Sequence, residues 1–229
     1  MTLHFFNSLL TPERVVASIC YAGAHKLEAM TTLDALEGKL RDAIQALPDG
    51  LRAHILRVEA EARALSSLHG VDEHRAVVSA LGHDLVRHLK GPELLSMAMR
   101  YGLTPDSVET AEPLLVHGPV AARILAHDYG FEDEEVLAGI DCHTTARAGM
   151  SPLEQVLFVA DKVEPHKLAR EPELGEVKER AQADLRAAVL CYLDFNLAKS
   201  IRRGWQVHPR SLEARNELIG LLGGGIAAT

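Results

Sequence analysis

The sequence predicts an all-α fold, a multi-helix bundle, on three observations. Apolar residues recur at steps of three and four along most of the chain, which is the spacing of an amphipathic helix. No segment alternates apolar and polar residues for long, and aromatic residues, which favour strands, make up only 4%. The 229 residues are 47% hydrophobic, so one domain can bury a substantial core.

The residues before the first predicted helix are interpreted as an extension of the fold. That helix, MTTLDALEGKLRDAIQAL, begins at Met30, which makes Met30 a candidate start of the native protein. Residues 1–30 are therefore predicted to be an N-terminal extension, residues 31–222 the folded domain, and residues 223–229, GGGIAAT, a loose tail.

The second and third helices have recognisable ends. Gly70 is expected to stop the second helix, and Asp72 is expected to cap the third, which runs up to His83. The apolar face of the second helix consists of Leu51, Ile55, Val58, Ala62, Leu65 and Leu68.

Proline and glycine residues mark predicted helix ends in the middle of the chain. Pro92 and Gly102 are predicted to open and close one helix. Thr104 is predicted to cap the next, with Pro105 at its first helical position. Residues 119–130 indicate another helix, and DEEVLAGIDCH a short one.

Three helices are predicted in the last third of the chain. Ser151 is a predicted cap, and Pro152 opens an amphipathic run that ends before Pro165. Residues 176–203 are predicted to form one long amphipathic helix, whose exposed face is a candidate homodimer contact. The segment HPRSLEARNELIGLL is the last helix.

Charge and cysteine content narrow the function. Lys and Arg number 24 and Asp and Glu 32, so the net charge is 24 − 32 = −8, which disfavours nucleic-acid binding. The cysteines Cys20, Cys142 and Cys191 lie far apart without a CxxC pair, so no disulfide framework or thiolate zinc site is expected. Without an apolar run of membrane-spanning length or a secretory leader, the chain is predicted to be cytoplasmic, with no membrane contact.

Histidine and aspartate residues near predicted helix ends form a candidate metal site. A buried carboxylate beside apolar residues is costly unless it is paired or bound to a metal. Imidazole and carboxylate ligands without thiolate suit iron, manganese, cobalt or zinc, and six of them are more than one tetrahedral zinc needs. These six ligands are enough to bind two metals if the carboxylate of Asp84 bridges them. The candidates are His54, His83, Asp84, His117, His143 and Asp161.

The order of these residues resembles a known family. The pattern H…HD…H…H…D in a helical chain is similar to the HD-domain metal-dependent phosphohydrolases. The words LLVHGPVAARIL, HTTARAGMS and VLFVADKVEP, in that order, resemble the YqeK-like branch, the symmetrical bis(5′-nucleosyl)-tetraphosphatases. The resemblance covers roughly residues 35–217 and implies hydrolysis of diadenosine tetraphosphate to two ADP by a water that two metal ions activate, with iron the usual metal.

The resemblance also implies roles for individual residues. His54, His83, Asp84 and Asp161 would bind one metal, and Asp84, His117 and His143 the other. Asp84 and Arg87 are the candidate catalytic residues. The small-molecule partner, a dinucleoside polyphosphate or a nucleotide, would be held by Arg87, Thr144 and Lys167.

The chain departs from the family pattern at three positions. Arg87 stands where the family commonly has Lys, and Lys167 where it commonly has Arg, which keeps the charge and changes its geometry. Ala146 replaces the Gly of HTTG, a change that alters the loop if that Gly serves a positive φ. These changes bear on substrate preference more than on reaction type.

Other interpretations stay open. The chain could hydrolyse another nucleotide or an alarmone, act as a non-catalytic nucleotide-binding or metal-binding regulator, or carry out di-iron oxygen chemistry. Lys162 is expected to point into solvent, and Trp205 is expected to anchor the last helix by packing rather than to stack on a base.

Overall fold

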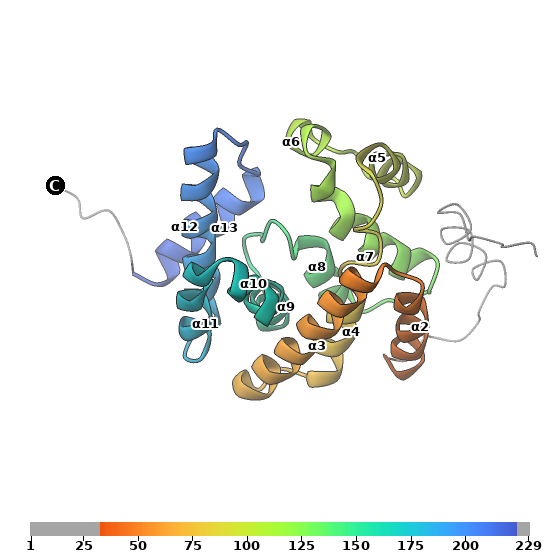
Figure 1. The fold of residues 1–229 in the computed structure, drawn as a ribbon, viewed down its shortest axis with the longest axis horizontal. Helices are drawn as coiled ribbons and strands as arrows, with labels where there is room; N and C mark the ends of the chain where they lie inside the picture. The colour runs from red at the N-terminus through yellow and green to blue at the C-terminus, as the bar shows by residue number, and fades with distance from the viewer. Residues whose placement is uncertain (1–32, 224–229) are drawn as a thin grey trace, which may run out of the picture.

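The computed structural model describes residues 33–223, and every regular element within that range is a helix, which confirms the all-α fold. Figure 1 shows the helices in order along the chain. They are α2 (Leu33–Gln45), α3 (Asp49–His69), α4 (Glu73–Gly82), α5 (Gly91–Arg100), α6 (Ser107–Ala111), α7 (His117–His127), α8 (Glu134–Cys142), α9 (Pro152–Val163), α10 (Pro165–Arg170), α11 (Gly175–Ala181), α12 (Leu185–Arg203) and α13 (Pro209–Leu221), with short 3₁₀ helices η1 (Pro113–Val116) and η2 (Pro172–Leu174).

Helix α9 is the central element of the bundle. It packs against α3, α4 and α8 on one side and against α11 and α12 on the other, and Figure 1 shows it in the middle of the molecule. Every residue from Leu153 to Val163 is buried, as expected for a helix enclosed by neighbours all round. Polar side chains on α9 therefore face the interior of the protein.

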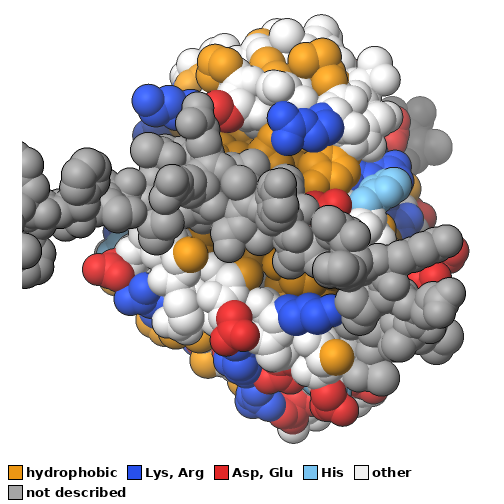
Figure 2. Space-filling view, turned by 90° about the vertical axis from the view of Figure 1, so that its right-hand side faces the viewer, with side chains coloured by type: hydrophobic (Ala, Val, Ile, Leu, Met, Phe, Trp, Pro, Cys, Tyr) orange, Lys and Arg blue, Asp and Glu red, His pale blue; other side chains and the backbone are white. Residues whose placement is uncertain are grey.

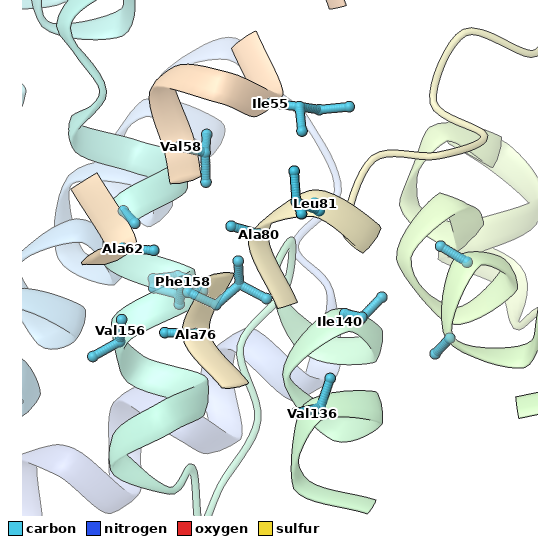
Figure 3. Packing of buried hydrophobic residues seen from close by; sticks show 14 of the residues in the cluster. Ile55, Val58, Ala62, Ala76, Ala80, Leu81, Val136, Ile140, Val156 and Phe158 are labelled. Carbon is cyan, nitrogen blue, oxygen red and sulfur yellow. The ribbon is translucent and has the colours of Figure 1, made fainter. Parts of the chain in front are cut away.

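The core lies between α3, α4, α8 and α9. Figure 3 shows Ile55 and Val58 from α3 facing Leu81 and Ala80 from α4, with Ile140 from α8 and Phe158 from α9 in the same cluster. These side chains are fully buried, and each buried methylene contributes about 0.8 kcal/mol. The core thus fixes the relative positions of four helices that also carry the candidate ligands.

Several predicted helix ends are confirmed. The side chains of Asp72 and Ser151 cap α4 and α9 by accepting hydrogen bonds from backbone N–H groups of the first turn. Gly70 ends α3 in the left-handed conformation, with φ +65°. These ends follow from local chemistry alone, which is why the sequence predicts them.

The predicted cap of α6 is wrong. Asp106, not Thr104, accepts hydrogen bonds from backbone N–H groups of the first turn, and Glu109 accepts one from the backbone N–H of Asp106. This reciprocal capping box satisfies more terminal N–H groups than a Thr cap followed by Pro105 could. The helix therefore begins two residues later than the predicted start.

The predicted single helix over residues 176–203 is also wrong, because α11 and α12 are separate. Asp184 caps α12 by accepting hydrogen bonds from N–H groups of its first turn. At the end of α11, the imidazole Nε2 of His69 lies 2.7 Å from the carbonyl oxygen of Ala181 and donates to it. A side chain of α3 thus forms a hydrogen bond with the end of α11. The spacing of apolar residues along residues 176–203 cannot predict this contact, because it comes from another part of the chain.

The described part of one face of the molecule is mixed in charge. On the face shown in Figure 2, acidic and basic side chains are interspersed among the described residues rather than gathered into a basic stripe. Among the described helices, none has both the length and the apolar character needed to cross a bilayer. The predicted extension, residues 1–30 with its alternative start, and the tail after Gly223 lie outside the described residues.

Candidate metal centre

Five helices from distant parts of the chain bring the six predicted ligands together. All six side chains are buried, and their polar atoms converge on one point beside α9. They are His54 in α3, His83 and Asp84 directly after α4, His117 at the start of α7, His143 directly after α8, and Asp161 in α9. His117 is the first residue of α7, which begins two residues before the predicted start at Pro119.

The carboxylate of Asp84 faces histidines on two sides. Its Oδ2 lies 3.4 Å from Nε2 of His54 and 3.5 Å from Nε2 of His83. Its Oδ1 lies 2.9 Å from Nε2 of His117 and 3.6 Å from Nε2 of His143. One carboxylate with each oxygen turned to a different pair of imidazoles has the arrangement of a bridging ligand.

The carboxylate of Asp161 lies near the same two histidines as Oδ2 of Asp84. Oδ1 of Asp161 lies 3.1 Å from Nε2 of His54 and 3.8 Å from Nε2 of His83. Two compact ligand groups result, and His83 belongs to both. One group is His54, His83 and Asp161, and the other is His83, Asp84 and His143.

The other ring nitrogen of each histidine fixes the tautomer. Nδ1 of His83 lies 2.6 Å from the Ala80 carbonyl oxygen, and Nδ1 of His143 lies 2.8 Å from that of Ile140. His117 bonds a carbonyl of η1 in the same way. Because a carbonyl oxygen only accepts, each Nδ1 carries the proton, and in a neutral ring Nε2 presents its lone pair. Histidines that bind metals are oriented by this kind of contact.

Two of these histidine nitrogens and both oxygens of Asp84 have no hydrogen-bond partner. Nε2 of His54, Nε2 of His83 and both oxygens of Asp84 are buried without a hydrogen bond. The Nε2 atoms of His117 and His143 face each other at 3.0 Å. Unpaired buried acceptors and opposed lone pairs are costly unless a cation lies among them. The donor set, nitrogen and oxygen without sulfur, fits a divalent transition metal.

The electrostatics keep Asp84 and His143 in metal-binding form. Burial by itself would raise the pKa of the Asp84 carboxyl, but His83, His117 and His143 outweigh it and hold that pKa well below its usual range. Burial lowers the pKa of His143 to about 3, helped by the neighbouring histidines. At neutral pH the site therefore offers an ionised carboxylate and a neutral imidazole.

Gly118 allows α7 to reach the end of α8. A Cβ added at Gly118 would lie 2.7 Å from the carbonyl oxygen of Ile140 and 3.0 Å from Nδ1 of His143. No side chain fits there without moving the backbone. The missing Cβ is what lets His117, its neighbour, come within 3.0 Å of His143.

Lys162 is buried, so the expectation that it points into solvent is wrong. It is only 5% exposed because α9 is enclosed on every side. Its ammonium donates to Oδ2 of Asp161 at 2.5 Å and to the backbone oxygen of His143 at 3.0 Å, and it lies over the rings of Phe158 and Tyr192. Lys162 thereby ties a ligand on α9 to the residue that ends α8.

The three predicted substrate contacts lie at the rim of the cluster. Nε of Arg87 is 3.6 Å from Oδ2 of Asp84, and its side chain is 41% exposed. Nζ of Lys167 donates to Oδ1 of Asp161 at 2.6 Å. The hydroxyl of Thr144 lies 3.2 Å from Nε2 of His143.

Ala146 adopts the left-handed conformation that favours glycine. Its φ is +61°, and it is the one non-glycine residue with positive φ among the described residues. The loop after His143 therefore has a backbone shape suited to Gly, and a buried methyl group is held there at some strain.

Glu164 and Arg57 lie beside the candidate ligand His54, and residue types alone did not indicate them. Oε1 of the buried Glu164 lies 3.4 Å from Nδ1 of His54, and Arg57 donates to the same carboxylate. Arg57 and His54 thus both contact the Glu164 carboxylate, which lies at the ring nitrogen of His54 that does not face the cluster. The word VEP, which contains Glu164, was the available signal.

A cavity of about 600 Å³ opens onto the cluster. Its volume is in the range of small-molecule sites. Charged and polar groups form part of its lining, and apolar residues of α6, η1 and the α12–α13 connection form another part. The charged part includes Asp84, Arg87, His117, His143, Thr144, Asp161, Lys162 and Lys167.

A third group of ligand-type residues lies at the rim of this cavity. Nε2 of His208 is 3.5 Å from Glu109 and 3.9 Å from Asp106. However, Nδ1 of His208 accepts a hydrogen bond from the backbone N–H of Arg210. In a neutral ring Nε2 then carries the proton and cannot bind a metal, so this group is better described as a contact between α6 and α13.

The chain is similar to proteins of a known family. The HD domain family matches residues 51–166. A symmetrical bis(5′-nucleosyl)-tetraphosphatase of Halalkalibacterium halodurans is 30% identical over 72% of this chain and 87% of its own length. The protein of the same name from Bacillus subtilis is 29% identical over 76% of this chain and 92% of its own length.

A solved structure agrees with these sequence relatives. The crystal structure of a predicted HD superfamily hydrolase involved in NAD metabolism from Clostridium acetobutylicum superposes with a TM-score of 0.75 at 28% identity. The match covers 84% of this chain and all of the other chain. The chain therefore belongs to the HD-domain family of metal-dependent phosphohydrolases, in the branch that contains the symmetrical bis(5′-nucleosyl)-tetraphosphatases.

Proposed function

We propose that this hydrolase cleaves diadenosine tetraphosphate into two ADP at the cluster around Asp84. The observation that carries the proposal is the split of the Asp84 carboxylate between two pairs of histidines inside a cavity lined by basic side chains. The names of the bacterial relatives support the substrate.

The same contacts support the ligand assignment that the resemblance implies. His54, His83, Asp84 and Asp161 would hold one divalent ion, and Asp84, His117 and His143 a second, with iron the first choice and manganese, cobalt or zinc as alternatives. Such ions supply the positive charge that lowers the pKa of water and offsets the charge of the phosphates.

The chain's own residues bind and orient the polyphosphate. Arg87 is half-exposed beside Asp84, and its planar guanidinium can pair with two phosphate oxygens at once. Lys167 and the hydroxyl of Thr144 line the same cavity and can donate to further phosphate oxygens. The net charge of −8 makes these local cations necessary for an anionic substrate.

The reaction balances without a redox partner. Water adds to one phosphorus of the tetraphosphate bridge, the bond from that phosphorus to a bridging oxygen breaks, and ADP leaves with the bonding electrons. The protons released pass to solvent. Since the pyrophosphate bond at the centre of the bridge is cleaved, both products are ADP.

The test is product analysis on protein purified without oxygen and with its metal retained. Diadenosine tetraphosphate should give ADP as the only nucleotide product. ATP and AMP would show asymmetric cleavage, and release of inorganic phosphate from a mononucleotide or alarmone at a higher kcat/KM would show that another nucleotide is the substrate. Either result would overturn the proposed substrate.

A further inference from the structure

The α12–α13 connection places an exposed tryptophan on the rim of the cavity. Trp205 is 52% exposed and lines the cavity that opens onto the metal cluster. The sequence-based expectation was that it packs as an anchor for the last helix, and this exposure contradicts it. A large aromatic side chain that lines a ligand-sized cavity and does not pack away calls for a different role.

The backbone of Trp205 is held at both ends. Gly204 ends α12 in the left-handed conformation, and the backbone N–H of Trp205 donates to the carbonyl oxygen of Ser200 at 2.9 Å. Three residues later, the side chain of His208 caps α13. A connection this short between two capped helices restricts the backbone that carries the indole.

The ring itself has a neighbour on one side. The guanidinium of Arg203 lies over the indole, 4.8 Å from the ring centroid. A cation over an aromatic face attracts the ring and so favours this position of the indole. Arg203 contacts the indole, yet Trp205 is still 52% exposed and belongs to the cavity lining.

The surrounding lining suits a nucleoside. Val108, Leu115 and Val207 contribute apolar surface to the same cavity, and the amides of Asn196 and Gln206 offer donors and acceptors. The basic residues that suit phosphates, Arg87 and Lys167, line the same cavity. Apolar walls, an aromatic plane and a few amides are the features that bind a heteroaromatic base.

We propose that Trp205 is the stacking platform of a nucleoside subsite, which makes the enzyme prefer nucleotides with a heteroaromatic base over base-free polyphosphates. The inference rests on the proposed function for its ligand class, a base attached to a polyphosphate. It adds a specificity-determining residue that the metal cluster and the phosphate contacts do not imply.

The chain offers a direct optical test, because Trp205 is its only tryptophan. Indole emission of the metal-loaded protein is titrated with ADP and, separately, with inorganic pyrophosphate. Stacking of adenine on Trp205 should change the emission saturably with ADP, and pyrophosphate should leave it unchanged. No change with ADP, or an equal change with pyrophosphate, would overturn the proposal.

Calorimetric binding of ADP to variants gives a second measure. Trp205→Ala should weaken ADP binding about 5- to 100-fold, the loss expected for one stacked base, whereas Trp205→Phe should keep most of the affinity. The control is Ile201→Ala, since Ile201 is 68% exposed on α12 and does not line the cavity. It should bind ADP as the parent does. Unchanged affinity in Trp205→Ala would overturn the proposal.

The two proposals fail separately. If ADP changes the emission of Trp205 but diadenosine tetraphosphate is not hydrolysed, the subsite stands and the proposed reaction falls. If the substrate is hydrolysed to two ADP and the emission does not respond to ADP, the reaction stands and Trp205 has no role in base binding.

Discussion

His117 and His143 direct their Nε2 atoms at each other across 3.0 Å. Both rings donate Nδ1–H to a backbone carbonyl, so in the neutral state two lone pairs meet in a buried space. The pKa of His143 lies near 3, mainly because burial disfavours the charged ring, which argues against a proton between them at neutral pH. A cation is the simplest partner for both nitrogens, and the predictions below depend on it.

Gly118→Ala should disrupt this pair. The new Cβ would lie 2.7 Å from the carbonyl oxygen of Ile140, so α7 must move away from α8. We expect a loss of about 1–3 kcal/mol in the free energy of unfolding, measured in urea, together with weaker metal retention.

Gly38→Ala is the matched control. Gly38 lies within α2, and a Cβ there meets nothing within 4 Å, so the substitution should add about 0.5–1 kcal/mol of stability. If Gly118→Ala were as well tolerated as Gly38→Ala, close approach of α7 to α8 would not be what positions His117.

Lys162→Met should expose the role of the buried ammonium. It leaves the Asp161 carboxylate without its partner at Oδ2 and removes a link to the end of α8. Breaking a buried pair costs on the order of 3–5 kcal/mol, and we expect a lower Tm in chelator-treated protein.

Lys199→Met tests whether any lysine pair behaves this way. Lys199 also pairs with a carboxylate, that of Glu171, and lies over the ring of Phe195, but the pair is partly exposed. Its loss should cost about 1 kcal/mol or less. Equal losses in the two variants would show that burial of Lys162 beside the cluster has no special consequence.

Arg87→Ala should weaken substrate binding and leave the ligands in place. We expect KM for diadenosine tetraphosphate to rise about tenfold, the value of a charge-assisted contact at a half-exposed site, with unchanged metal content. Arg87→Lys should restore much of the loss. The exposed Arg100, which does not line the cavity, provides the control. Loss of metal from Arg87→Ala would mean that Arg87 holds the cluster rather than the phosphates.

Ala146 tests the backbone shape of the loop after His143. Because its φ is +61°, Ala146→Gly should leave the free energy of unfolding within about 1 kcal/mol, as relieved strain offsets the added chain entropy. Ala146→Val should lower it by on the order of 1–3 kcal/mol, since a β-branched residue rarely adopts this conformation. Urea unfolding of both variants decides, and a stable Val variant would contradict the assignment of strain.

The sequence predicts what local chemistry determines. Asp72, Ser151 and Gly70 fulfil their predicted roles because a cap or a helix stop depends on a few neighbouring residues. The break between α11 and α12 is not of this kind, since His69 reaches it from another helix. The direction of Lys162 likewise depends on how completely other helices enclose α9.

The candidate site, too, could be predicted from the sequence only in part. The residue types indicate a metal site, but only the resemblance to a family implied that His54, Asp84 and Asp161 bind the same metal. In the structure, Nε2 of His54 lies 3.4 Å from Oδ2 of Asp84 and 3.1 Å from Oδ1 of Asp161. The sequence did not predict the contact of Glu164 with His54, because it depends on how distant helices pack. The place of Trp205 likewise depends on the capped α12–α13 connection. The predicted dimer contact through α12 stays a prediction.

Metal content by mass spectrometry, on protein purified without oxygen, is the measurement on which the role of Asp84 depends. The parent should carry two divalent ions per chain. Asp84→Ala should carry fewer than one, with unchanged far-ultraviolet circular dichroism and at least a hundredfold less hydrolysis of diadenosine tetraphosphate, the upper end of what even outer ligand partners contribute. If Asp84→Ala kept two ions and hydrolysed the substrate at the parent rate, a carboxylate shared between two metals would not be the basis of this enzyme.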